Sequence, residues 1–259
     1  AGVRSSRYGI RPFPSPEGWL KAMKTMAGYF EGSSPAAIWI VGELYRPKDV
    51  QLDFPGGEKP VPRVKFGDAD LHEAFLTVFD EAGVKIFLQV EPAHADVETL
   101  IDLVLGRYRH HACVAGFGID VEWLREADFP GRGSPVSDEE ARTWEARVKS
   151  WNPGYRLFLK HWNPKWMPAT YRGDIIFVDD SQIFESREEM IREFTEGWAP
   201  AFYPNPVVFQ IGYGSDKPWW SKLETPPRDL GEAIRAGVKQ DMGIIWVDFT
   251  LRDVLPEED

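Results

Sequence analysis

The chain has 259 residues, a formal net charge of −11 and an isoelectric point near 5.0. This length is typical of one (β/α)8 barrel, so we expect a single domain over residues 1–259. The acidic balance argues against nucleic acid and anionic membranes as partners, and no apolar run is long enough to cross a bilayer.

Short β-rich runs alternate with helical patterns along the chain, which is typical of parallel strands joined by crossover helices. The pattern predicts eight strands, at Tyr8–Phe13, Ala37–Leu44, Val84–Glu91, Ala115–Trp123, Tyr155–Trp162, Ile175–Gln182, Val207–Tyr213 and Gly243–Phe249. It predicts helices at Pro16–Phe30, Ala69–Ala82, Asp96–Tyr108, Asp138–Lys149, Arg187–Trp198 and Leu230–Gln240. The predicted fold is therefore an α/β (β/α)8 TIM barrel, with the crossover helix between the fifth and sixth strands missing or irregular.

Three long irregular stretches are expected, at Tyr45–Asp68, Leu124–Gly133 and Gly214–Pro227. Each follows a predicted strand rather than a helix. Loops of that kind build the active-site face of a (β/α)8 barrel, so we expect any active site there.

The fourth predicted strand changes from small and apolar to acidic at its end, at Asp120 and Glu122. Strand side chains alternate between faces, so these two carboxylates are expected to point the same way. Like charges held close together raise one pKa, which keeps a carboxyl protonated near neutral pH. We expect Glu122 to act as a general acid and Asp120 to assist it.

Strand parity predicts a polar side chain at the inner end of every strand. The predicted ring comprises Arg11, Glu43, Gln89, Glu91, Asp120, Glu122, Lys160, Asp180, Gln182, Gln210, Trp246 and Asp248. In the sixth strand we favour the pair Asp180 and Gln182 over Asp179. Buried charges are costly unless they are paired, hydrated or bound to a ligand. Lys160 and Arg11 have the alternative role of neutralising nearby carboxylates in a salt-bridge network.

The chain is rich in aromatic residues, with 11 Trp, 8 Tyr and 16 Phe, and flat rings with polar edges suit the faces of sugars. Expected substrate-binding residues are Glu43, Glu91, Lys160, Trp162, Gln182, Gln210, Tyr213, Trp246 and Asp248. Other candidate platforms near the loops are Trp123, Trp166, Trp219 and Trp220.

The segment Phe117-Gly118-Ile119-Asp120-Val121-Glu122-Trp123 resembles the fourth-strand signature of family 18 chitinases and of family 25 lysozymes. The resemblance implies that Glu122 is the acid and that Asp120 orients a 2-acetamido group, the nucleophile of the chitinase type. It also implies a Trp under the sugar, at Trp246. The chain departs from the full chitinase signature at Ala115 and Gly118, where that signature is acidic.

Two further positions depart from these families. The sixth strand has Phe177 and Val178 before Asp179, without the Tyr of the chitinase type, and Arg11 stands where family 25 lysozymes have a first-strand Asp. A mechanism without an acetamido group therefore stays open, in which Asp180, Asp248, Glu91 or Glu43 partners Glu122 as nucleophile or base.

We expect a glycoside hydrolase that cleaves a polysaccharide or oligosaccharide, including polymers of N-acetylated amino sugars. The alternative is a barrel that binds carbohydrate without catalysis. The single Cys113 excludes a multi-cysteine metal site, and the His spacing lacks a metal motif, so we expect no metal and no cofactor. A start at Ala1-Gly2 is compatible with a processed secreted protein, and we expect a secreted monomer.

Overall fold

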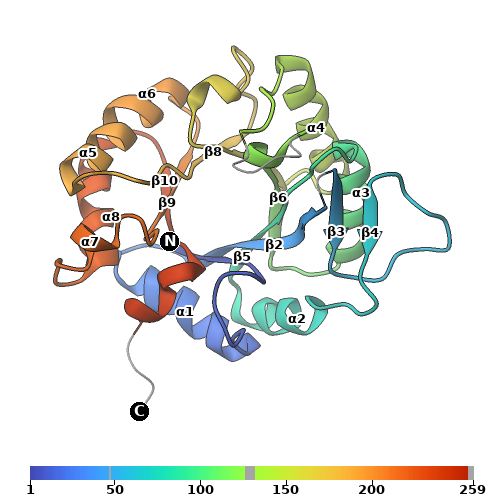
Figure 1. Ribbon diagram of the computed structural model, residues 1–259, viewed down its shortest axis with the longest axis horizontal. Coiled ribbons are helices and arrows are strands. Elements are labelled where there is room, and N and C mark those ends of the chain that lie inside the picture. The colour runs from blue at the N-terminus through green and yellow to red at the C-terminus, as the bar shows by residue number, and fades with distance from the viewer. Residues whose placement is uncertain (47, 126–131, 256–259) are drawn as a thin grey trace.

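A computed structural model describes residues 1–46, 48–125 and 132–255. Eight parallel strands form a closed barrel, and β1 pairs with both β2 and β10 to close it (Figure 1). The barrel strands are β1 (Gly2–Ser5), β2 (Ala36–Tyr45), β5 (Lys85–Val90), β6 (Val114–Asp120), β7 (Arg156–Lys160), β8 (Ile176–Asp179), β9 (Val207–Ile211) and β10 (Met242–Trp246). The predicted (β/α)8 barrel is confirmed.

The first predicted strand is wrong. Strand β1 is Gly2–Ser5, and the predicted run Tyr8–Phe13 lies in the loop that follows it. Pro12 falls inside that run, and a proline cannot donate to the hydrogen bonds of a central strand. Arg11 therefore does not stand at a strand end, and the inward position of the first strand belongs to Arg4.

Helices surround the barrel on its outside (Figure 1). The structure has α1 (Pro16–Gly28), α2 (Glu73–Ala82), α3 (Val97–Tyr108), α4 (Asp138–Trp151), α5 (Arg187–Arg192), a π-helix η3 (Glu193–Trp198), α6 (Ala199–Phe202), α7 (Lys217–Trp220) and α8 (Pro226–Gly237). The last helix begins before its predicted start because Pro226 suits a first helical turn. Between β7 and β8 the chain forms only the 3-10 helix η2 (Pro164–Trp166), so the missing crossover helix is also confirmed.

Local sequence explains where helices begin. In α1, the Ser15 side chain accepts from the backbone N–H of Gly18, and Trp19, Met23 and Met26 place one apolar face on the barrel. In α4, Ser137 and Glu140 form a reciprocal capping box.

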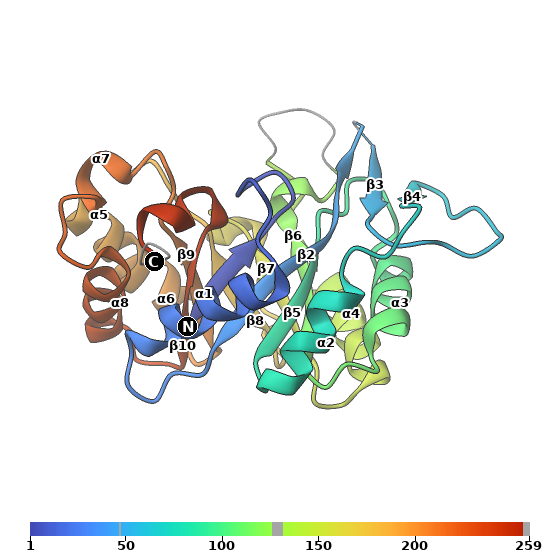
Figure 2. The ribbon, with the colours of Figure 1, turned by 90° about the horizontal axis from the view of Figure 1, so that it is seen from below.

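Two additional strands lie within the first stretch that was expected to be irregular. Strand β3 (Asp49–Leu52) pairs antiparallel with the end of β2, and β4 (Val64–Phe66) pairs with β3. They extend from one side of the barrel beside the carboxyl end of β2 (Figure 2). Val50 and Leu52 alternate with polar residues and are buried, which explains the strand. Residue 47 of this stretch, and 126–131 of the second, lie outside the described residues.

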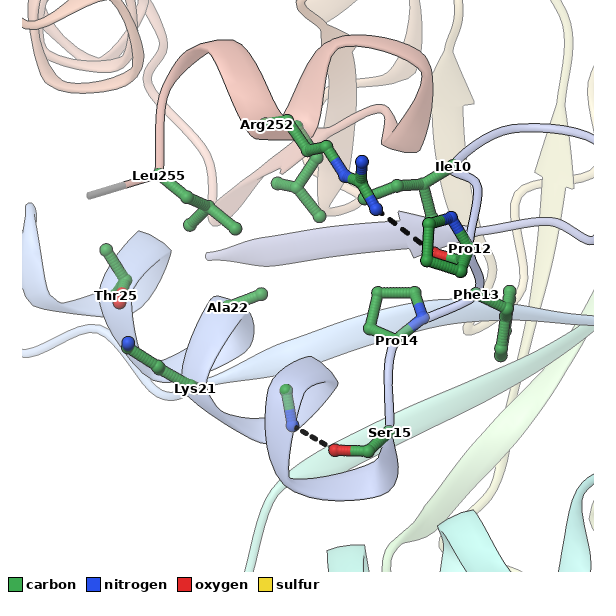
Figure 3. Close-up of a pocket in the computed structure, with 12 residues that line it drawn as sticks. Ile10, Pro12, Phe13, Pro14, Ser15, Lys21, Ala22, Thr25, Arg252 and Leu255 are labelled. Carbon is green, nitrogen blue, oxygen red and sulfur yellow. Dashed lines mark hydrogen bonds between the residues drawn. The ribbon is translucent and has the colours of Figure 1, made fainter. Parts of the chain in front are cut away.

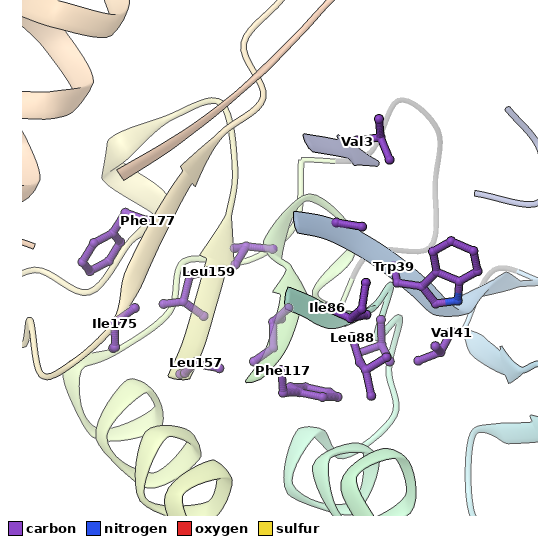
Figure 4. Packing of buried hydrophobic residues seen from close by; sticks show 14 of the residues in the cluster. Val3, Trp39, Val41, Ile86, Leu88, Phe117, Leu157, Leu159, Ile175 and Phe177 are labelled. Carbon is purple, nitrogen blue, oxygen red and sulfur yellow. The ribbon is translucent and has the colours of Figure 1, made fainter. Parts of the chain in front are cut away.

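The two faces of the barrel strands have different environments. Outward side chains such as Trp39, Leu88, Phe117 and Phe177 pack in the large core between sheet and helices (Figure 4). A second cluster, made of Ile38, Phe158, Ile176, Val178 and Ile245, fills the barrel interior. The polar inward residues lie nearer the carboxyl ends of the strands than this cluster does. The apolar cluster therefore closes the barrel interior beneath the acidic residues at the carboxyl-terminal mouth.

Glycine at position 118 is required by this interior packing. A Cβ on Gly118 would lie 1.9 Å from the ring of Phe158 on the neighbouring strand. Phe158 therefore fills the space beside position 118, where the chitinase signature has an acidic residue.

Candidate active site

Three carboxyl groups meet at the carboxyl-terminal mouth of the barrel. Oxygen atoms of Asp120, Glu122 and Asp180, the carboxylate trio, all lie within 4.8 Å of one another. Strand β6 ends at Asp120, and Glu122 lies in the 3-10 helix η1 (Val121–Trp123). The expected proximity of Asp120 and Glu122 is present, but a tight turn produces it rather than strand alternation.

Lys160 joins two members of the trio. Its Nζ atom lies 2.8 Å from Oδ2 of Asp120 and 2.5 Å from Oδ2 of Asp180, and all three side chains are buried. Asp120 and Lys160 are register partners on β6 and β7, so both point into the barrel. Burial alone lowers the pKa of Lys160, but the two carboxylates raise it well above its usual value. Lys160 is therefore a permanent cation that favours the ionised form of Asp120.

The proton of the trio is best placed on Glu122. Burial raises the pKa of Glu122 to about 8, with further contributions from Asp180 and Asp120. Burial also raises the pKa of Asp120 to about 7, against the opposing effect of Lys160. Asp120 accepts hydrogen bonds from Lys160 and from Nε2 of Gln89, 3.2 Å away. These donors stabilise its ionised form, which leaves Glu122 as the protonated acid.

The trio is also the oxygen-rich group that a hard cation would bind. The Lys160 ammonium group already lies between Asp120 and Asp180 and supplies part of that charge. A second group that could hold a metal combines Glu73 with His110 and His111. There, His111 bonds to Asp80 and His110 to Glu73, so both imidazoles already have partners within the fold.

Two of the predicted substrate-binding acids accept hydrogen bonds from the β1–α1 loop. Glu91 accepts from the Tyr8 hydroxyl at 2.6 Å and from the backbone N–H of Leu44 at 2.8 Å. Glu43 accepts from the backbone N–H of Arg7 at 2.9 Å, and burial raises its pKa to about 7. Tyr8 was missed as a site residue because it was assigned to a strand.

Asp248 has a structural role in this geometry. Its Oδ1 accepts from Arg4 Nε and Nη2, at 3.1 and 2.6 Å, and its Oδ2 accepts from the backbone N–H and hydroxyl of Ser6, at 2.8 and 2.6 Å. Four hydrogen bonds leave little capacity for a reacting group. Asp248 is therefore a poor partner for Glu122, and Arg4 is a second inward residue that the first-strand error concealed.

The predicted position of Trp246 under the substrate is wrong. Trp246 is fully buried, and its Nε1 donates to Thr250 at 3.1 Å. Its ring lies 5.2 Å from that of Trp220 in α7, in the core outside the barrel. Strand β10 ends at Trp246, and the chain then turns into η4 (Asp248–Asp253), so residues 246 and 248 do not share a face.

Of the two aspartates at the end of the sixth predicted strand, Asp180 points inward, as expected, and Asp179 does not. Asp180 joins the trio, whereas Asp179 points outward to Glu193 of η3. Burial and Glu193 raise the pKa of Asp179. Burial also raises the pKa of Glu193, against the opposing effect of Asp179. Gln182 is not brought to the trio. It is exposed, and its Oε1 lies 3.5 Å from the hydroxyl of Ser215.

The remaining predicted residues border the mouth. Gln210 is fully buried, and neither polar atom of its side chain has a hydrogen-bond partner within the described residues. Tyr213 is buried close enough to Asp180 and Lys160 for their charges to affect its pKa, which burial raises. Trp162 follows β7, is 40% exposed and stacks on His161 at 5.0 Å.

A cavity of about 710 Å³ lies away from this chemistry, between α1 and η4 (Figure 3). Its walls include Pro12, Pro14, Lys21, Arg252 and Leu255, and the residues described as lining it contribute no carboxylate. It therefore offers no acid of the kind found at the mouth.

No family model matches the chain, and neither the curated proteins nor the solved structures include a match. The part of the chain that the structure describes holds no helix with the length and apolar character of a bilayer-spanning segment. The resemblance to family 18 chitinases and family 25 lysozymes therefore rests on the residues of one strand within a closed parallel barrel.

Proposed function

We propose that the protein is a glycoside hydrolase in which Glu122 is the general acid and Asp120 its assisting carboxylate. One observation carries the proposal: a carboxyl group with its pKa raised to about 8 lies within 4.8 Å of two further carboxylates at the mouth of the barrel. Glycosidases use such a protonated carboxyl beside an ionised one.

In the proposed reaction, Glu122 donates its proton to the glycosidic oxygen as the bond between that oxygen and the anomeric carbon breaks. A nucleophile on the opposite side forms a new bond to the anomeric carbon. Water then displaces this nucleophile and gives its proton to the Glu122 carboxylate, which restores the acid.

Two nucleophiles are compatible with this geometry. One is the acetamido oxygen of the substrate, oriented by Asp120. The other is Oδ1 of Asp180, which has no hydrogen-bond partner within the described residues, while Oδ2 binds Lys160. Stereochemistry would be read from the products, because a nucleophilic Asp180 and an acetamido nucleophile both give retention.

The test is Glu122→Gln, which keeps the side-chain volume and removes the ionisable proton. We expect kcat to fall by about 10²- to 10⁴-fold, the usual contribution of a general acid. New reducing ends would be measured on chitin, peptidoglycan, galactosaminoglycan and glucan, with Glu139→Gln on the exposed side of α4 as the matched control. Turnover by Glu122→Gln equal to that of the wild type would refute the assignment.

A non-catalytic carbohydrate-binding barrel is the second candidate. The observation that favours it is the Lys160 bridge, because an ion pair at the mouth can serve stability without catalysis. Binding of a polysaccharide without new reducing ends, in wild type and Glu122→Gln alike, would support it. The proposed substrate remains a polysaccharide or oligosaccharide, and secretion and a monomeric state stay predictions.

A further inference from the structure

Two exposed aromatic rings lie together at the mouth, on elements that are far apart in sequence. Tyr8, in the loop after β1, is 43% exposed, and Phe249, in η4 after β10, is 47% exposed. Their ring centroids are 6.0 Å apart with an interplanar angle of 34°. Figure 2 shows both elements at the same end of the barrel, next to each other. We call this pair the aromatic platform.

Contacts with two buried side chains, Arg4 and Glu91, hold the aromatic platform in place. The Arg4 guanidinium lies 4.5 Å from the centroid of Phe249 and 5.8 Å from that of Tyr8. Arg4 is itself held by Asp248, and the Tyr8 hydroxyl is held by Glu91. The rings therefore have little freedom to lose when a ligand binds, which favours affinity.

A cavity adjoins the platform. It has a volume of about 470 Å³, and Tyr8 lines it together with Arg7, Arg11 and Glu43. This volume is within the usual range of small-molecule sites. An apolar ring beside guanidinium and carboxyl groups is a combination that suits a pyranose, which has apolar faces and hydroxyl groups around its edge. Burial raises the pKa of Glu43 to about 7, so this carboxyl can donate as well as accept near neutral pH.

The platform and Trp162 are associated with strands on different sides of β6. Around the barrel, β10 and β1 are separated from β6 by several strands, whereas β7, which Trp162 follows, is the neighbour of β6. The Tyr8 hydroxyl reaches Glu91 at the end of β5, the other neighbour of β6. Exposed rings are thus associated with strands on both sides of β6, the strand that ends at Asp120.

We propose that Tyr8 and Phe249, with the cavity beside Tyr8, form a sugar-binding subsite opposite Trp162, so that an extended polysaccharide lies across the mouth and is cleaved at an internal bond. The cleavage in this inference rests on the proposed glycosidase function, whereas the binding of the sugar to the subsite does not depend on it. A terminal sugar alone would leave one of the two aromatic surfaces without a contact.

The experiment compares Phe249→Ala, Tyr8→Ala, Glu122→Gln and the wild type by electrophoresis through gels that contain soluble chitin, galactosaminoglycan or glucan. Tyr203→Ala is the matched control, because Tyr203 is 61% exposed but precedes β9 at the opposite end of the barrel. Loss of a ring that covers the sugar should weaken polymer binding about tenfold. Tyr203→Ala and Glu122→Gln should bind as the wild type does.

Hydrolysis provides the second measurement. Phe249→Ala should raise KM for the polymer about tenfold, with kcat little changed, and the wild type should release oligosaccharides of mixed length. Phe249→Ala leaves no buried group unpaired, since no hydrogen bond of its side chain is lost, so it tests the subsite even where Tyr8→Ala disturbs Glu91.

The outcomes separate the two proposals. Wild-type binding and KM in Phe249→Ala would overturn the subsite and leave the glycosidase standing. Full activity in Glu122→Gln together with weakened binding in Phe249→Ala would overturn Glu122 as the acid and leave the subsite standing. Binding that is weakened in Phe249→Ala, without new reducing ends from the wild type, would overturn the glycosidase and leave the binding subsite standing. Release of single sugars only, or no binding to any of the three polymers, would overturn the extended-chain arrangement.

Discussion

Adjacent aspartates at the end of β8, Asp179 and Asp180, have opposite environments. Asp180 faces the barrel interior, where its carboxylate lies 2.5 Å from Lys160. Asp179 faces the helices, where its carboxyl group meets that of Glu193. Both aspartates are buried, but one is paired with a cation and the other with a second acid.

The difference shows how burial is compensated on each side of one strand. Inside the barrel, the Lys160 ammonium group compensates the buried carboxyl groups of Asp120 and Asp180 beside Glu122. On the outer side, burial and the charge of Glu193 raise the pKa of Asp179 well above its usual value, and burial also raises the pKa of Glu193. Two buried carboxyl groups this close favour a proton on one of them, so we expect a shared proton to stabilise this outer acid pair.

The largest expected effect comes from removing the cation with Lys160→Met. Asp120 and Asp180 would then be buried without a counter-charge, and breaking such a pair costs about 3–5 kcal/mol. Urea unfolding at pH 7 would measure this as a lower midpoint.

The double variant Lys160→Met/Asp180→Asn is the control, since it removes one of the two uncompensated charges. It should recover part of the lost free energy of unfolding. Equal stability of Lys160→Met and the wild type would show that the ion pairs contribute nothing to the fold.

The barrel could be predicted because its signals are local. Seven of the eight predicted strands overlap observed ones, since apolar runs between helical patterns mark them in sequence. Strand β1 could not be found in this way, because four residues carry little pattern. Its place depends on pairing with β2 and β10, and a Cβ on Gly2 would lie 1.7 Å from the carbonyl oxygen of Ala36.

The site was predictable only where strand alternation continues to the end of the strand. Asp120, Lys160 and Asp180 are close together as that rule implies. Glu122 and Trp246 show its limit, because turns begin at Val121 and after Trp246 and redirect the following side chains. The Tyr8–Phe249 contact joins residues 241 positions apart, and no sequence spacing could indicate it.

The outer acid pair gives an effect of intermediate size. Because the pKa of Asp179 is higher in the folded state than in the unfolded state, protonation favours the fold, and this stabilisation is lost as the pH rises above the unfolded value. Asp179→Asn replaces the shared proton with an amide donor to Glu193. We expect thermal unfolding of the variant to match the wild type near pH 4 and to show about 1–3 kcal/mol greater stability at pH 9. A wild type that stays the more stable at pH 9 would contradict the shared proton.

The smallest effect expected is on the pH dependence of hydrolysis. Glu122 must be protonated to act as the acid, and burial beside Asp180 and Asp120 raises its pKa to about 8. Activity should therefore be constant below that pH on this limb and should fall about tenfold per pH unit above it. Asp179→Asn should leave the limb in place, because the outer acid pair lies on the other face of β8. Asp180→Asn removes a candidate nucleophile and should lower the rate, but its residual activity should show the limb at lower pH, because a neighbouring carboxyl group that raises the pKa of Glu122 is gone. Initial rates from pH 6 to pH 10 would locate the alkaline limb in each variant. A limb that moves in Asp179→Asn but not in Asp180→Asn would contradict the assignment of the essential proton to Glu122.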